Sequence, residues 1–128
     1  MPGPANAGLF IYAKDLDHLG GFYETVCSMA VLHRSDDLIV LESPDIQLLV
    51  HAIPASIAAG ITITAPPQWR EETPLKFFFT VPDLSKTTAI IAGLGGEVAT
   101  QRWSGPGFVA VNACDPEGNI FQLRQKTG

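Results

Sequence analysis

Two stretches of the sequence share one plan: Leu75–Leu84 reads LKFFFTVPDL, and Gly8–Leu16 reads GLFIYAKDL. Each is a short apolar and aromatic run that ends at an aspartate followed by a leucine. Such runs are typical of β-strands, and Asp is among the residues preferred at the N-cap of a helix. We therefore expect a strand followed by a helix in each half of the chain.

The sequence after each aspartate continues the same pattern. Apolar residues recur at helical spacing, and glycines at 93, 95 and 96 are expected to end the second helix. Asp115–Asn119, DPEGN, predicts a tight turn near the end of the chain. Each helix is followed by material for three short strands, expected at 30–34, 38–42 and 46–52 in the first half and at 97–103, 108–113 and 120–124 in the second.

This internal repeat defines the expected organisation. The chain should be α+β, with one βαβββ module at 7–53, a linker at 54–73 and a second module at 74–126. Because 128 residues is a common size for one domain, we expect both modules to belong to a single domain.

Composition excludes several classes of partner. The net charge of −5 argues against nucleic acid, and no apolar run approaches the roughly 20 residues that span a bilayer. The first residues do not read as a signal peptide, so we expect a cytoplasmic protein. Its two thiols, Cys27 and Cys114, are expected to be free and buried.

Three segments resemble the vicinal oxygen chelate superfamily, which includes glyoxalase I, bleomycin-resistance proteins and extradiol dioxygenases. They are Lys14–Glu24 (KDLDHLGGFYE), Val81–Leu84 (VPDL) and Asp115–Gln122 (DPEGNIFQ). The resemblance covers nearly the whole chain. It implies one cupped eight-stranded mixed sheet with helices outside, in a homodimer.

The positions that hold a metal in many members of the superfamily are altered here. The resemblance places them at Gly8, Gln47, Lys76 and Gln122. Glycine has no side chain, a lysine ammonium has no lone pair, and two glutamine oxygens are weak ligands by themselves. We therefore expect neither a metal nor another cofactor.

Strand alternation indicates which side chains would line the cup instead. Aromatic walls with a few polar groups are typical of a small-molecule site. The predicted ligand-binding residues are Phe10, Tyr12, Gln47, His51, Lys76, Phe78, Trp103 and Gln122.

The sequence favours a protein that binds a small, planar or aromatic molecule, as an antibiotic-sequestering protein would. The charge of this molecule stays open, because the acidic composition favours a cation and Lys76 favours an anion. One alternative is a glyoxalase-like lyase or isomerase, or a dioxygenase, with an atypical metal site or with Lys76 or His51 as acid–base. Another alternative is an interaction module whose aromatic residues all lie in the core.

Overall fold

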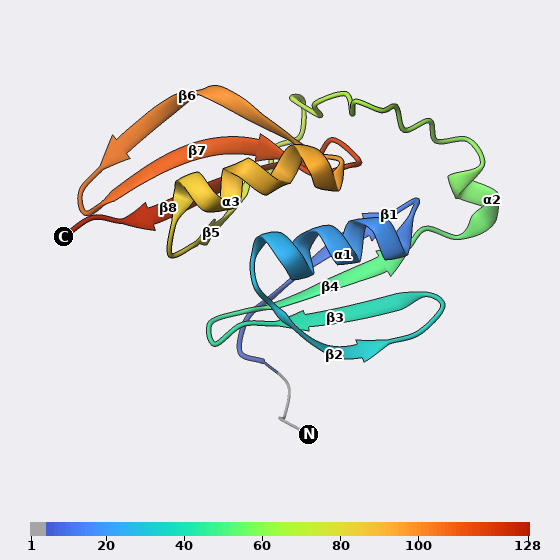
Figure 1. The fold of residues 1–128 in the computed structure, drawn as a ribbon. Coiled ribbons are helices and arrows are strands. Elements are labelled where there is room, and N and C mark those ends of the chain that lie inside the picture. Colours follow the sequence, from blue (N-terminus) through green and yellow to red (C-terminus); the bar gives the residue numbers. More distant parts are fainter. Residues whose placement is uncertain (1–4) are drawn as a thin grey trace. The chain divides into compact units, whose positions relative to one another are not determined.

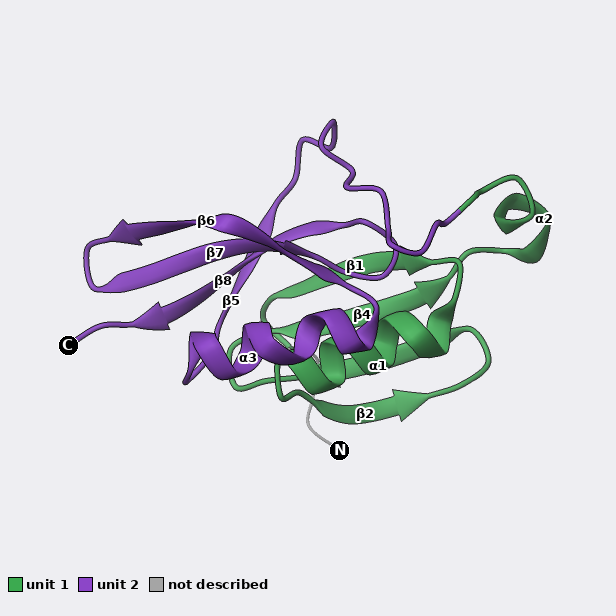
Figure 2. Cartoon of the chain, turned by 45° about the horizontal axis from the view of Figure 1, so that its top comes forward, with its two compact units in different colours: residues 1–62 green, residues 63–128 purple. Residues whose placement is uncertain are grey.

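A computed structural model describes residues 5–128 and divides the chain into two compact units. Unit 1 ends at Thr62, and unit 2 runs from Ile63 to Gly128 (Figure 2). Each unit contains one helix of at least two turns and one four-stranded sheet.

In unit 1 the sheet order is β1-β4-β3-β2, in which β1 is parallel to β4 and the other pairs are antiparallel (Figure 1). The elements are β1 (Gly8–Ala13), α1 (Leu16–Val26), β2 (Ala30–Arg34), β3 (Leu38–Glu42), β4 (Gln47–Ala52) and the short α2 (Ala55–Ala58).

Unit 2 repeats this topology with the order β5-β8-β7-β6, in which β5 is parallel to β8. Its elements are β5 (Phe77–Thr80), α3 (Leu84–Ile91), a 3₁₀ turn (Ala92–Leu94), β6 (Glu97–Gly105), β7 (Phe108–Cys114) and β8 (Ile120–Lys126).

The predicted α+β class with two βαβββ modules is confirmed, and the strands are hydrogen-bonded as two mixed sheets of four. Some bounds differ from the prediction. Strand β5 begins two residues later than expected, β6 and β8 each end two residues later, and α2 forms inside the predicted linker. No helix among residues 5–128 is long and apolar enough to cross a bilayer.

The aspartates of the repeat begin the helices as expected. The Asp15 carboxylate accepts a hydrogen bond from the backbone N–H of His18 (3.2 Å), and Asp83 accepts one from that of Lys86 (3.0 Å). These bonds satisfy N–H groups that have no partner within the helix. Gly95, at φ 94°, then closes the second helical segment in the left-handed region that glycine favours.

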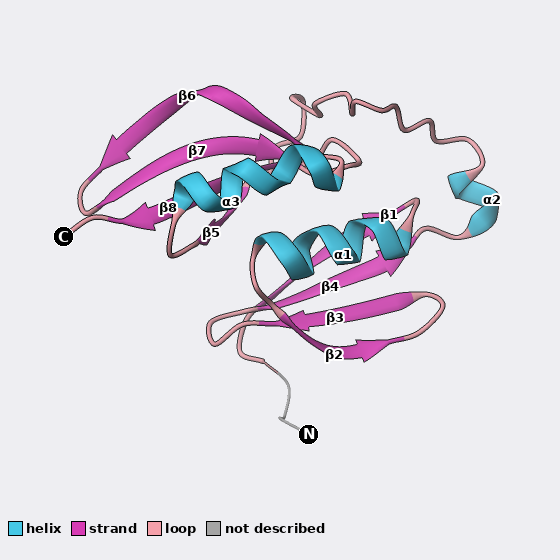
Figure 3. Ribbon diagram, in the orientation of Figure 1, coloured by secondary structure: helices cyan, strands magenta, loops and turns pink. Residues whose placement is uncertain are grey.

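One face of each sheet packs against the helix of its own unit. Helix α1 lies on β3 and β4, and α3 contacts β6 and β8 (Figure 3). The buried residues of unit 1 alternate along its strands, as a half-buried sheet requires. Gly20 permits the close approach of α1, because a Cβ there would lie 2.5 Å from Cδ1 of Ile39.

One edge strand of each sheet contains an irregularity in pairing. The β2–β3 register shifts between Val31 and His33, and the β6–β7 register shifts between Val98 and Arg102. The inner pairs β3–β4 and β7–β8 are in continuous register. The irregularities are therefore confined to the strands at the edge of each sheet.

Candidate functional site

The candidate site residues lie on the open faces, which we define as the sheet face opposite the helix in each unit. On β1, Phe10 and Tyr12 are 55% and 58% exposed, whereas Ile11 and Ala13 between and beside them are buried. The alternation therefore turns the two aromatic rings away from the core of unit 1.

The pairing of β1 with β4 brings predicted residues of unit 1 together. Tyr12 lies opposite His51, with ring centroids 5.8 Å apart, and Phe10 stacks beside Tyr12 at 6.3 Å. Gly8 lies opposite Gln47, which is in turn opposite Glu42 on β3. Aromatic side chains and polar side chains therefore lie beside each other on the open face of unit 1.

His51 has a defined hydrogen bond at one ring nitrogen. Its Nδ1 lies 2.8 Å from the carbonyl oxygen of Ala52, so Nδ1 carries the proton and donates it. In the neutral ring this leaves Nε2 as a proton acceptor.

On the open face of unit 2, Phe78 is 53% exposed and lies opposite Gln122. Gln122 is opposite Asn112 on β7, and the Oδ1 atom of Asn112 is 3.5 Å from Nζ of Lys76. Three predicted residues of this unit therefore lie together, and Asn112 joins them.

Arg124 is the functional candidate that sequence reasoning missed. The guanidinium carbon lies 4.0 Å from the ring centroid of Phe78 and 4.1 Å from that of Phe108. The Nε atom donates a 2.7 Å hydrogen bond to Oε1 of Gln122. A signal was present, because Arg124 is two residues beyond Gln122 on a strand and must share its face.

Trp103 completes this face on the edge strand β6. It is 47% exposed and pairs with Ala110, which itself pairs with Arg124. The other tryptophan, Trp69, donates a 2.8 Å hydrogen bond from its indole N–H to Glu97. That bond fixes Trp69 on the segment before β5.

The residues at the superfamily's metal positions do not fit a divalent metal. Gly8 offers no donor, and the Lys76 ammonium is a hydrogen-bond donor toward Asn112. The side-chain oxygen of Gln122 already accepts a bond from Arg124. Among residues 5–128, no three His, Cys, Asp or Glu side chains gather as potential ligands.

The two cysteines are free thiols, of which Cys114 is buried as expected and Cys27 is partly exposed. Burial raises the pKa of Cys27 to about 12. Burial also raises the pKa of Cys114 to about 12, and the carboxylates of Asp115 and Glu97 add to this shift while a backbone hydrogen bond from Glu97 opposes it. Neither thiol is poised as a nucleophile at neutral pH.

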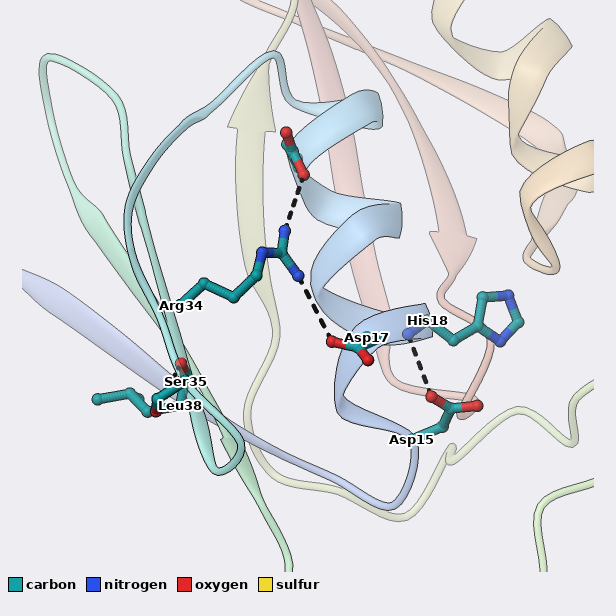
Figure 4. A network of polar contacts seen from close by, with 7 residues as sticks. Asp15, Asp17, His18, Arg34, Ser35 and Leu38 are labelled. Atoms are coloured by element: carbon teal, nitrogen blue, oxygen red, sulfur yellow. Dashed lines mark hydrogen bonds and ion pairs between the residues drawn. The ribbon is translucent and has the colours of Figure 1, made fainter.

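A surface pocket of about 700 Å³ lies elsewhere in unit 1 and is lined by residues 14–17 and 34–36. Two of its lining residues, Arg34 on β2 and Asp17 on α1, form an ion pair (3.5 Å), and Arg34 also pairs with Glu24 (3.4 Å) (Figure 4). None of the predicted ligand-binding residues lines this pocket. It is therefore distinct from the open face.

Several solved structures with this fold carry names of the glyoxalase, bleomycin-resistance and dioxygenase class. A family enzyme of this class from Burkholderia phytofirmans PsJN aligns with a TM-score of 0.73 at 16% identity, over 97% of this chain and 100% of that one. Lactoylglutathione lyase from Agrobacterium tumefaciens gives 0.61 at 21% identity, over 97% and 95%. A bleomycin resistance determinant encoded on transposon Tn5 gives 0.59 at 17% identity, over 98% and 100%.

Residues 8–124 match the family model described as the glyoxalase-like domain, and the chain belongs to this family. The resemblance to the vicinal oxygen chelate superfamily is thereby confirmed. No curated protein matches the sequence.

Proposed function

We propose that this protein binds a planar aromatic small molecule on its open faces, without a metal, and that sequestration of an antibiotic is one form this activity takes. The observation that carries the proposal is the exposure of four aromatic side chains on these faces, namely Phe10, Tyr12, Phe78 and Trp103. Large apolar side chains that cluster outside a core typically mark a binding surface.

The residues beside these rings support recognition of a ligand more than a reaction. Gln47, Gln122 and Asn112 supply amide groups that can both donate and accept hydrogen bonds. Stacking on an aromatic side chain contributes about 0.5–1.5 kcal/mol per pair beyond the burial of area. Two or three such contacts would add about 1–4.5 kcal/mol to the binding free energy of a flat ligand.

A thermal-shift screen over antibiotics, aromatic acids and glutathione adducts tests the proposal. A compound that raises Tm should bind the Phe78→Ala and Trp103→Ala variants more weakly, by roughly 2- to 12-fold each. Ile57→Ala is the matched control, since this exposed apolar side chain lies on α2 and outside both sheets. Affinity that survives both aromatic substitutions would place the ligand elsewhere, and the absence of any binder would favour an interaction module.

A second candidate function is a metal-free lyase or isomerase of the glyoxalase type, with His51 as the base. The hydrogen bond from Nδ1 to Ala52 favours it, because this bond fixes the tautomer with Nε2 as the acceptor. Turnover of a hemithioacetal that is lost in His51→Gln but kept in His33→Gln would establish this function. His33 is a suitable control because it lies exposed on the edge strand β2.

A further inference from the structure

Arg124 is a cation held in place by its surroundings on the open face of unit 2. Its guanidinium is flanked by the rings of Phe78 and Phe108, at 4.0 and 4.1 Å from their centroids. The bond from Nε to Gln122 fixes the rotation of the group within its plane. Two aromatic contacts and one hydrogen bond therefore preorganise this side chain.

The guanidinium retains the edge that recognises oxyanions. With Nε bonded to Gln122, the Nη1 and Nη2 groups form no hydrogen bond or ion pair within unit 2, all of which the structure describes. That edge presents two parallel N–H donors, the geometry that matches both oxygens of one carboxylate.

The charge of this face points to an anion even though the whole chain is acidic. Residues 1–62 contain two Lys or Arg and seven Asp or Glu, whereas residues 63–128 contain six of each. Around Arg124, Lys76 is bonded to Asn112, and Lys126 pairs with Phe108. Three cations thus share the open face of unit 2, on which Glu97 is the one acid of the sheet strands.

Trp103 indicates where the rest of a ligand would lie. Arg124, Ala110 and Trp103 occupy one row across β8, β7 and β6. Two strand spacings separate the ends of this row by roughly 10 Å between Cα atoms. Ala110 itself is buried, so the exposed indole of Trp103 is the aromatic surface of this row that a ring attached to the carboxylate could contact.

We propose that Arg124 is the carboxylate-binding group of the site and that the ligand class is an aromatic carboxylic acid. This inference rests on the proposed binding function and specifies the charge of its ligand. Phe78 and Phe108 act as positioning residues that hold the guanidinium plane, and Gln122 selects the edge that faces the ligand.

Matched pairs of probes test the inference by calorimetry on the full chain: 1-naphthoate against 1-naphthamide, and benzoate against benzamide. We expect each acid to bind at least about tenfold more tightly than its amide, as a charge-assisted pair of hydrogen bonds provides. In Arg124→Gln this ratio should fall to about one. Arg124→Lys keeps the positive charge but lacks the two parallel N–H donors. In this variant the ratio of acid to amide affinity should fall partway toward one.

Arg102→Gln is the control, because it makes the same change in charge on the same sheet. Arg102 pairs with Val111, which faces the core, so Arg102 lies opposite the face that carries Arg124. The ratio between acid and amide should be unchanged in this variant. Higher salt should lower the ratio in the wild type and leave the amide affinity unaltered.

The outcomes separate the two proposals. Equal binding of acid and amide to the wild type, or a ratio that survives Arg124→Gln, overturns the carboxylate subsite but leaves the proposed function standing. If neither naphthyl probe nor any aromatic compound of the screen binds, both proposals fail. Even if Arg124→Gln does not fold, the comparison of acid with amide in the wild type still tests whether the site prefers a carboxylate.

Discussion

Gly20 and Gly21 are neighbours in α1 but have different surroundings. A Cβ at Gly20 would meet Ile39 on β3, whereas a Cβ at Gly21 has no neighbour within 4 Å. In a helix, Ala is favoured over Gly by about 1 kcal/mol. Gly21→Ala should therefore raise the free energy of unfolding by about 1 kcal/mol, and Gly20→Ala should be about 1–3 kcal/mol less stable than Gly21→Ala because it overpacks the core.

Urea unfolding of the two variants measures this difference. The variant Gly20→Ala/Ile39→Val provides the control, since removal of one methyl group from the buried Ile39 makes room for the new Cβ. If Gly20→Ala alone were as stable as Gly21→Ala, the close contact between α1 and β3 would not restrict the side chain at position 20.

The two free thiols make the free energy of unfolding depend on pH in the alkaline range. The pKa values of Cys27 and Cys114 rise from 9.0 to about 12 on folding. The folded state therefore holds these protons while the unfolded chain releases them, so the associated stability is present below pH 9 and is lost progressively between pH 9 and 12.

Other groups titrate in the same range, so the measurement is a difference between two proteins. The free energy of unfolding of the wild type should fall faster from pH 8 to 10.5 than that of Cys27→Ala/Cys114→Ala. A constant difference across this range would contradict the shifted pKa values.

At the scale of elements, the DPEGN turn between β7 and β8 is built around one buried carboxylate. Asp115 accepts hydrogen bonds from the backbone N–H groups of Glu117 (2.9 Å) and Asn119 (3.0 Å) and from the Asn119 side chain (2.8 Å). The sequence that resembles the superfamily's final turn thus has a structural role in this chain.

Asp115→Ala should lower the free energy of unfolding by about 3 kcal/mol or more, since it leaves two backbone donors without partners. The corresponding turn of unit 1 supplies the control. Asp45 is exposed there, and Asp45→Ala should change stability by less than about 0.5 kcal/mol. Similar losses in the two variants would show that burial of Asp115 is unimportant.

The elements that sequence predicts well are those with both a periodic pattern and a marked end. Strands β2 and β3 have the predicted bounds, and both main helices begin after the predicted aspartates. Helix α2 was missed because four residues are too few to show a period. The end of β8 was missed because Gln125 and Lys126 are polar, and they extend the strand by pairing with β7.

The sequence predicts which side chains share a face of one strand, but it does not predict which side chains on neighbouring strands touch. Alternation alone assigns Phe10 and Tyr12 to one face of β1. It cannot show that Phe108 covers the guanidinium of Arg124, because this requires the register of β7 with β8.

At the scale of the whole molecule, the exposed aromatic residues bear on assembly as well as on binding. Resemblance to the superfamily predicts a homodimer, and aromatic side chains are enriched at protein interfaces. Sedimentation at micromolar concentration should therefore give twice the 13.7 kDa mass of the chain. A monomer under these conditions would contradict the prediction, and a ligand-dependent dimer would place the open faces in contact with the partner copy.

The irregular pairing in the outermost strands has a consequence for solubility. A sheet with a regular exposed edge is a template to which another molecule can add a strand, and this leads to aggregates. The shifts at 31–33 in β2 and 98–102 in β6 interrupt the row of outward N–H and C=O groups that such growth would require. Each half of the repeat therefore has this interruption at one of its two edge strands, because β1 and β5 at the opposite edges pair in continuous register.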